Sequence, residues 1–260
     1  MTSADAPAHT DSRTTVRMHA KVPEVTAVFW VVKILTTGMG EAASDFLGTV
    51  NLVLAGVVGV GGFAAALYWQ LHTDRYRPVA YWSAVAMVAV FGTMVADGVH
   101  VALGVPYAVS TAGALVLLCA VLVRWYRREG TVSIHSITTR SRETSYWLTV
   151  LITFALGTAA GDWTASSLHL GFLLSGVLFA AAIVVPWLAW RRGRLGEVAA
   201  FWTAYVITRP LGASFADWFG KPHSISGLGF GDGTVTGIAL LAIVCLVTWI
   251  ARTGYGVQRA

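Results

Sequence analysis

The side chains that could do chemistry in this sequence are carboxylates, and they recur at one spacing. An aspartate stands fifteen residues after a tryptophan in four segments, at Asp45, Asp97, Asp162 and Asp217. Glu41 adds a fifth carboxylate one helical turn before the first of them. Carboxylates within an apolar chain can bind a cation or exchange a proton, and at membrane depth they are functional candidates because burying them is costly. The pattern therefore indicates an acidic site that favours cations.

Each aspartate belongs to a longer repeated pattern. An aromatic residue precedes the tryptophan, a glycine follows the tryptophan by ten residues, and a small residue precedes the aspartate. The tryptophan and glycine of the four copies are Trp30 and Gly40, Trp82 and Gly92, Trp147 and Gly157, and Trp202 and Gly212. Self-similarity in one register is the signature of a repeat architecture. We expect the four tryptophans to be packing residues or anchors at the membrane interface.

One helical face of each copy carries nearly all of its ionisable residues. Positions 3, 7, 11 and 15 after each tryptophan lie four residues apart and therefore share a face, here named the polar stripe. Its polar members are Lys33, Thr37, Glu41, Asp45, Thr93, Asp97, Thr158, Asp162, Arg209 and Asp217. The stripe is expected to face a central axis, where five acids outnumber two bases. Carboxylates crowded in this way would not all stay ionised, which suits proton coupling.

Structural roles compete with the chemical ones. An aspartate at a helix end can cap the next helix, and a fourfold repeat would reproduce that cap four times. Lys33 and Arg209 can neutralise Glu41 or one aspartate in an internal ion pair. Glu41 is the sharpest candidate, because its counterparts in the other copies are two threonines and an alanine, so no role shared by the repeats accounts for it.

Three histidines follow the aspartates on the outer side, at His100, His169 and His223. A transition metal could take Asp97, His100, Asp162 and His169 as ligands. The spacing is not uniform and the chain has no HxxxH or HExxH motif, so solvated loop histidines are the competing interpretation. A bound divalent metal ion is the cofactor that these residues suggest.

The elements that must position these residues are membrane helices. Hydrophobic residues make up 56% of the chain and charged residues 12%, and the mean hydropathy is +0.66. This balance excludes nucleic-acid binding and the soluble enzyme classes. Each copy contains two apolar stretches long enough to cross a bilayer as helices. The eight predicted spans are 24–45, 49–69, 79–99, 106–124, 145–165, 170–190, 198–218 and 235–251.

Basic residues gather at the connections between copies and at both ends of the chain, while Lys221 stands alone on the other side. The positive-inside rule therefore predicts cytoplasmic termini. Every first helix then runs outward, which predicts parallel repeats about an axis along the membrane normal. The predicted organisation is a disordered cytoplasmic tail at 1–22, copies one and two at 23–126, a cytoplasmic linker at 127–144, copies three and four at 145–253, and a tail at 254–260.

The fourth copy has a long outer connection containing the glycine-rich run 227–233. This run does not match GxGxxG and follows no strand, so it is not a nucleotide-binding loop. We expect a flexible or re-entrant loop that could cover the aspartates.

The fourfold aromatic-Trp, Gly and Asp pattern, with ADWFGKP before a glycine-rich loop, resembles a family of bacterial integral membrane proteins. That family is built from four tandem two-helix repeats with a characteristic tryptophan, and the likeness covers about 29–252. The resemblance implies eight helices in a bacterial inner membrane and carries no information on the substrate. Copies two and three depart from the pattern, since Val85 and Val150 replace polar stripe residues.

Two classes of function remain. The leading hypothesis is a small secondary transporter or channel for a cation, a divalent metal or one coupled to protons, which uses the acidic layer of the first helices. The alternative is a non-transporting intramembrane enzyme, or a sensory or assembly scaffold whose stripe is a structural network. The sequence holds no convincing Ser-His pair, HExxH or CxxC motif, which favours the transporter. The expected partners are the lipid bilayer and a small ion, with no nucleic acid.

Overall fold

The eight apolar stretches form helices, as their hydropathy predicts. The computed structural model describes residues 20–258, and this range contains no β-strand. The first helices of the four copies are α1 (Ala27–Val50), α4 (Pro78–Val101), α6 (Arg140–Asp162) and α8 (Glu197–Gly220). The second helices are α2 (Leu52–Gly56) continued by a π turn (Val57–Gly61) into α3 (Gly62–Leu71), then α5 (Tyr107–Glu129), α7 (Gly171–Arg191) and α9 (Asp232–Thr253). Short turns lie at Ile134–Ser136, Trp163–Ser167 and His223–Ile225.

Six of these helical segments are long and apolar enough to cross a membrane. They are Leu52–Leu71, Pro78–Val101, Tyr107–Glu129, Arg140–Ser167, Gly171–Arg191 and Asp232–Thr253. The two outside this set are α1 and α8, which carry the buried charges Lys33, Glu41 and Arg209. The composition thus identifies a multi-pass membrane protein, and the two long helices outside this set are both first helices of a copy.

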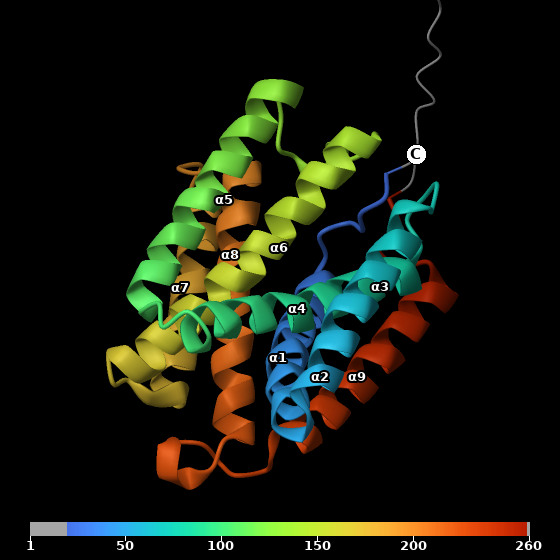
Figure 1. The fold of residues 1–260 in the computed structure, drawn as a ribbon. Helices are drawn as coiled ribbons and strands as arrows, with labels where there is room; N and C mark the ends of the chain where they lie inside the picture. Colours follow the sequence, from blue (N-terminus) through green and yellow to red (C-terminus); the bar gives the residue numbers. More distant parts are fainter. Residues whose placement is uncertain (1–19, 259–260) are drawn as a thin grey trace, which may run out of the picture.

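The four first helices form a closed ring. Helix α1 packs against α4, α4 against α6, α6 against α8, and α8 against α1. Each second helix lies outside the ring and packs on the first helix of the following copy: α3 on α4, α5 on α6, α7 on α8, and α9 on α1. The last contact joins the fourth copy to the first, so the ring closes within a single chain. In Figure 1 the C-terminal end of the chain and the loop between α8 and α9 lie at opposite ends of the bundle.

The repeated glycine marks the point where neighbouring ring helices touch. A Cβ atom added at this position would collide with the next copy in each case: Gly40 with Ala89, Gly92 with Phe154, Gly157 with Arg209, and Gly212 with Thr37. Each partner is position 7 of the next polar stripe. Small residues permit such close approach between membrane helices. The glycine therefore sets the spacing of the ring.

The aromatic pairs close a second ring of contacts, nearer the start of the first helices. The aromatic residue of each copy packs on the tryptophan of the next, with ring centroids 5.6 Å apart for Phe29–Trp82, 5.7 Å for Tyr81–Trp147, 6.2 Å for Tyr146–Trp202 and 5.8 Å for Phe201–Trp30. Such pairs contribute about 0.5–1.5 kcal/mol each beyond area burial. Three of the four tryptophans are buried and Trp30 is partly exposed. The motif tryptophans are therefore packing residues.

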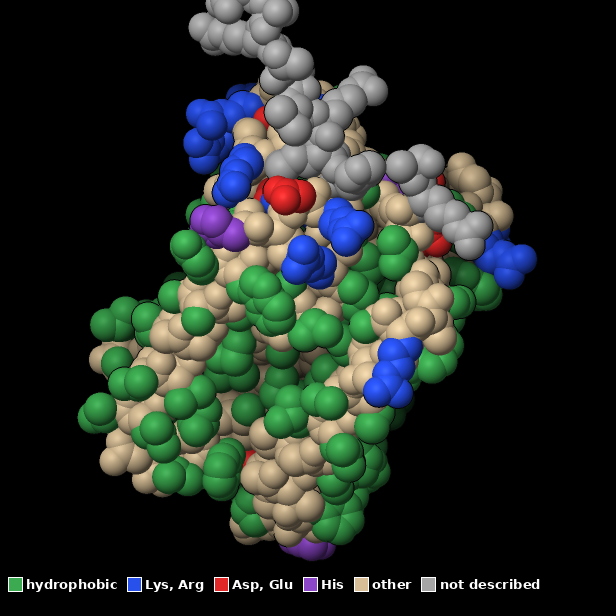
Figure 2. Space-filling view, turned by 90° about the vertical axis from the view of Figure 1, so that its right-hand side faces the viewer, with side chains coloured by type: hydrophobic (Ala, Val, Ile, Leu, Met, Phe, Trp, Pro, Cys, Tyr) green, Lys and Arg blue, Asp and Glu red, His purple; other side chains and the backbone are tan. Residues whose placement is uncertain are grey.

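The outer surface suits lipid. Large apolar side chains of the second helices point away from the bundle, among them Leu52, Val116 and Leu241. Figure 2 shows hydrophobic side chains over most of the face seen, with most of its Lys and Arg side chains gathered at one end. Exposed apolar area of this extent is typical of a membrane-embedded surface.

The start of the described chain is packed against the bundle. Of the predicted tail at 1–22, residues up to 19 lie outside the described part, whereas Lys21 and Val22 are buried. The Lys21 ammonium forms an ion pair with Glu143 at 2.7 Å, and the backbone N–H of Lys21 donates to the Ile137 carbonyl at 3.4 Å. Hydrogen bonding and charge pairing compensate the burial of both charged groups.

The segment between α5 and α6 is shorter than the linker predicted at 127–144. Helix α5 continues to Glu129 and α6 begins at Arg140. The Trp202 Nε1–H donates to the Val132 carbonyl at 2.9 Å, so a motif tryptophan holds this segment against the ring.

Candidate functional site

One polar residue from each ring helix meets on the axis, and together these four residues form the axial cluster. They are Glu41 of α1, Thr93 of α4, Thr158 of α6 and Arg209 of α8. All four are buried. The polar stripe therefore faces the interior where the ring helices converge, as the cost of burying charge in lipid predicts.

The Arg209 guanidinium is the centre of the axial cluster. Its Nη2 donates to Glu41 Oε2 at 2.8 Å, to Thr158 Oγ1 at 2.7 Å and to Thr93 Oγ1. Its Nη1 donates to the Thr37 carbonyl at 3.2 Å. The two threonine hydroxyls also lie 3.1 and 3.3 Å from Glu41 Oε2. A buried ion pair survives only with such additional hydrogen bonds, and here they tie all four ring helices together.

Towards the aromatic pairs, Lys33 and four aromatic rings are buried inside the ring of first helices. Among the described residues, the Lys33 ammonium makes no hydrogen bond and lies 4.2 Å and 4.3 Å from the ring centroids of Phe154 and Tyr205. The Tyr81 and Tyr146 hydroxyls meet at 2.5 Å. The ion pair expected for Arg209 thus forms, whereas Lys33 makes cation–π contacts instead. These side chains block the axis on this side of the axial cluster.

On the other side of the axial cluster lie the repeated aspartates. One carboxylate oxygen from each of Glu41, Asp162 and Asp217 lies within 4.8 Å of the others, and we name these residues the acidic cluster. Asp217 is 5% exposed, and among the described residues its Oδ1 accepts no hydrogen bond. Asp45 and Asp97 are partly buried. The ring therefore brings carboxylates from three helices together, and this arrangement can hold a cation.

Lys221 neutralises part of this acidic end. Its ammonium donates to Asp45 Oδ2 and to Asp232 Oδ2, the second at 3.0 Å. Burial lowers the pKa of Lys221, but the neighbouring Asp45 and Asp217 carboxylates outweigh this and hold the pKa above its usual value. Lys221 stays protonated and links the end of α8 to α1 and α9. Asp232 was not expected from the sequence, because it lies outside the repeat pattern.

The glycine-rich loop folds back onto α8. The N–H groups of Leu228 and Phe230 donate to the carbonyls of Trp218 and Phe219 at 2.6 and 3.0 Å. These hydrogen bonds hold the loop against the last turn of the helix that carries Asp217. The loop therefore lies beside the acidic end of the bundle.

The repeated aspartates do not cap the following helices. Asp45 lies within α1, which continues to Val50, and the cap of α2 is Asn51. The Asn51 Oδ1 accepts from the N–H groups of Val53 and Leu54 at 2.9 and 3.0 Å. The capping interpretation of the aspartates is therefore wrong for the described helices, because α2 is capped by Asn51 and the N-termini of α5, α7 and α9 have no side-chain cap.

The predicted metal ligands Asp97, His100, Asp162 and His169 are not assembled as a set. The described residues contain one group of three converging metal-type ligands, the acidic cluster, and it includes only Asp162 of the four. His100 Nδ1 lies 2.8 Å from the Val105 carbonyl and its ring stacks on Tyr107 at 3.6 Å. His169 is exposed. His100 lies in the last turn of α4 and His169 in the connection before α7, so the two do not share a repeat position and the ring does not bring them together.

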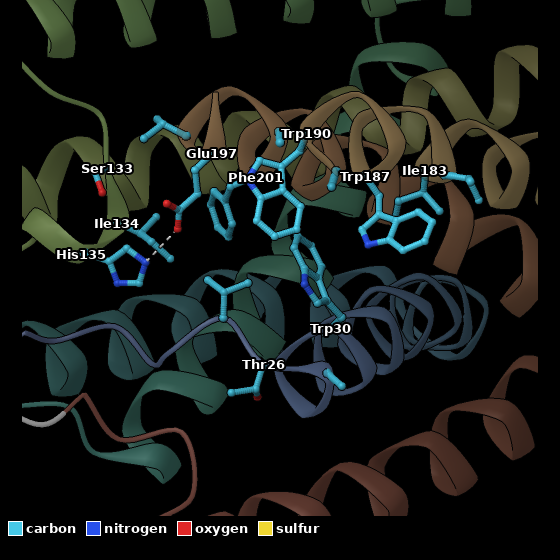
Figure 3. Close-up of a pocket in the computed structure, with 16 residues that line it drawn as sticks. Thr26, Trp30, Ser133, Ile134, His135, Ile183, Trp187, Trp190, Glu197 and Phe201 are labelled. Atoms are coloured by element: carbon cyan, nitrogen blue, oxygen red, sulfur yellow. Dashed lines mark ion pairs between the residues drawn. The ribbon is translucent and has the colours of Figure 1, made fainter. Parts of the chain in front are cut away.

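A separate cavity, the wall pocket, lies on the side of the bundle. It has a volume of about 610 Å³ and lies between α1, α7, α8 and residues 133–135. Figure 3 shows Trp30, Trp187, Trp190 and Phe201 around it, with the His135–Glu197 ion pair of 3.9 Å at its edge. None of the axial cluster residues lines it. The wall pocket is mainly apolar and lies off the axis.

Comparison with known proteins gives the repeat a family. Residues 80–131, 145–194 and 200–255 match the model described as Repeat of Unknown Function (DUF347). The chain belongs to the DUF347 repeat family. Each matched DUF347 segment holds most of one first helix and the whole second helix that follows it. No curated protein and no solved structure matches the chain.

The axial cluster draws unequally on the four copies, of which the DUF347 model matches the second, third and fourth. Copies one to three contribute position 11 of the stripe, namely Glu41, Thr93 and Thr158, whereas copy four contributes Arg209 from position 7. Position 11 of the fourth copy is Ala213, which is buried. The arginine is one turn earlier than its partners, and a long side chain spans that turn.

Proposed function

We propose that the protein is a small transporter or channel of the bacterial inner membrane that carries a cation along the axis of the first-helix ring. The observation that carries the proposal is the acidic cluster, formed by three helices beside the Glu41–Arg209 ion pair. Ionisable residues at membrane depth mark ion pathways when they face a bundle interior.

The proposed orientation has all eight helical segments crossing the membrane, with both termini in the cytoplasm. The gathering of basic side chains at one end of the bundle supports it (Figure 2). In this orientation the repeats run parallel about the membrane normal, and the acidic cluster lies towards the outside. Repeats arranged in this way offer a central pathway.

The proposed path has an acidic outer part and a closed inner part. The carboxylates raise the local cation concentration at the outer end. Further in, the positive charge of Arg209 opposes a cation, and Lys33 lies buried between the rings of Phe154 and Tyr205. Passage requires Arg209 to leave Glu41, so the arrangement represents a closed state of the proposed pathway.

A structural network is the second candidate. The hydrogen bonds of Arg209 reach all four ring helices, which a clamp that only holds the bundle together would also require. Such a scaffold would need the ion pair for folding and would show no flux. The two candidates therefore differ in transport and not in fold.

The test is ion flux in proteoliposomes, followed with a pH-sensitive dye and a panel of mono- and divalent cations. We expect flux with the wild-type protein and a loss of roughly tenfold or more in Glu41→Gln. Glu197→Gln is the matched control, since Glu197 is exposed at the wall pocket and should keep wild-type flux. Absence of flux for every cation, with protein that is folded and oriented, would reject transport for that panel. Full flux in folded Glu41→Gln would reject the path through the axial cluster.

A further inference from the structure

We infer that Glu41, Asp162 and Asp217 form a binding site for one hard divalent cation. The inference deepens the proposed function, on which it rests for the role of the ion, while ion binding can be measured alone. The residues come from α1, α6 and α8, so no single repeat can form the site.

The oxygen positions suit a hard cation. Such ions take carboxylate oxygens at about 2.0–2.6 Å, so two ligand oxygens of one ion lie no more than about 5 Å apart. The three carboxylate oxygens of the acidic cluster lie within 4.8 Å of one another. The group contains only oxygen donors, which favours the class of Mg²⁺, Ca²⁺ and Mn²⁺ over metals that prefer nitrogen or sulfur.

Asp217 supplies a second, independent observation. It is 5% exposed, and among the described residues its Oδ1 has no hydrogen-bond partner. An unpartnered buried carboxylate oxygen is costly, whereas a coordinated cation would satisfy it. The nearby ammonium of Lys221 donates to Asp45 and Asp232 instead. The unsatisfied atom therefore belongs to the carboxylate that completes the acidic cluster.

The charge of the site matches a divalent ion. When a cation is bound, the three carboxylates are ionised and carry three negative charges, of which Arg209, paired with Glu41 at 2.8 Å, offsets one. The remaining two negative charges would be neutralised by one divalent cation.

Asp97 provides a matched control within the same chain. It occupies the same repeat position as Asp162 and Asp217 but does not belong to the acidic cluster. A diffuse acidic layer would depend on all repeated aspartates alike. In a specific binding site, the affinity for the cation would depend on Asp162 and Asp217 and would not change in Asp97→Asn.

The experiment is a titration of purified full-length protein with Mn²⁺ alone, followed by the electron paramagnetic resonance signal of free Mn²⁺. We expect one saturable Mn²⁺ per chain, an affinity about tenfold weaker or worse in Asp162→Asn and in Asp217→Asn, and wild-type affinity in Asp97→Asn. Thermal unfolding of each variant checks that it is folded. If Asp217→Asn does not fold, the number of Mn²⁺ ions bound by the wild-type protein and the affinity of Asp162→Asn still test the inference.

Two results would overturn the inference: no saturable Mn²⁺ binding by folded wild-type protein, or equal loss in all three variants. Flux assays on the same preparation separate this inference from the proposed function. Flux of protons or a monovalent cation without Mn²⁺ binding would reject the divalent site and leave transport standing. Mn²⁺ binding with the expected variant pattern but without flux would support the site and reject transport.

Discussion

The two halves of the first-helix ring use the same four helices in different ways. In the half that holds the aromatic pairs, every copy repeats one contact, an aromatic ring on the tryptophan of the next copy. In the half that holds the axial cluster, one copy supplies Glu41 and another supplies Arg209. The repeated residues therefore determine how the helices pack, whereas the charged pair comes from residues that the copies do not share. The predictions below test how separate these two contributions are.

The largest expected effect comes from breaking the buried ion pair. Arg209→Met removes the partner of Glu41 and leaves a carboxylate unpaired on the axis. We expect the free energy of unfolding to fall by about 3–5 kcal/mol, measured by denaturant titration in detergent. The double variant Arg209→Met, Glu41→Gln removes both charges and should recover part of the loss. Equal stability of wild type and Arg209→Met would show that the pair is not buried as described.

A ring contact should respond less strongly. A Cβ atom in Gly157→Ala would collide with the Cβ and Cγ atoms of Arg209. Overpacking of this kind typically lowers the free energy of unfolding by about 1–3 kcal/mol. Gly113→Ala in α5 is the matched control, because nothing lies within 4 Å of its added Cβ atom. If the two variants have the same free energy of unfolding, the repeated glycine is not needed for close approach of the ring helices.

The aromatic half offers a more symmetrical test, with an expected cost of the same order. Phe29 and Phe201 already occupy the repeat position of Tyr81 and Tyr146, whose hydroxyls bond each other at 2.5 Å. Replacing one of these tyrosines by phenylalanine should cost about 1–3 kcal/mol of unfolding free energy, because the other hydroxyl stays buried and unpaired. Replacing both should cost less than either single change, as a double-mutant cycle would measure. Additive costs would mean that the two hydroxyls do not interact.

The wall pocket should contribute nothing to flux. Trp187 lines it and lies away from the axial cluster. Trp187→Leu keeps an apolar side chain there, so we expect flux in proteoliposomes equal to that of wild type. A strong loss of flux in a folded variant would place the path in the wall and not on the axis.

The ring could be anticipated from the sequence because its determinants are local and repeated. The register of Trp, Gly and Asp identified the four first helices, and the spacing of the stripe predicted which face turns inward. Arg209 and Glu41 were likewise recognised as candidates for an ion pair. All of these follow from helical periodicity and from the cost of charge in lipid.

The contacts between copies could not be read in the same way. The sequence does not say that α9 returns to α1, or that Asp162 and Asp217 converge with Glu41 while Asp97 does not. The partner of Lys33 was also missed, since a ring face is a cation partner that charge counting overlooks. These features depend on the relative rotation of helices, which no single segment encodes.

Closure of the ring within one polypeptide has a genetic consequence. In an assembly of four identical subunits, any substitution appears four times around the axis, so a lone glutamate cannot face a lone arginine. Here the four units share one reading frame, and a codon change in one unit leaves the other three as they were. The bundle can therefore acquire an asymmetric centre by single mutations while the duplicated contacts keep holding it together.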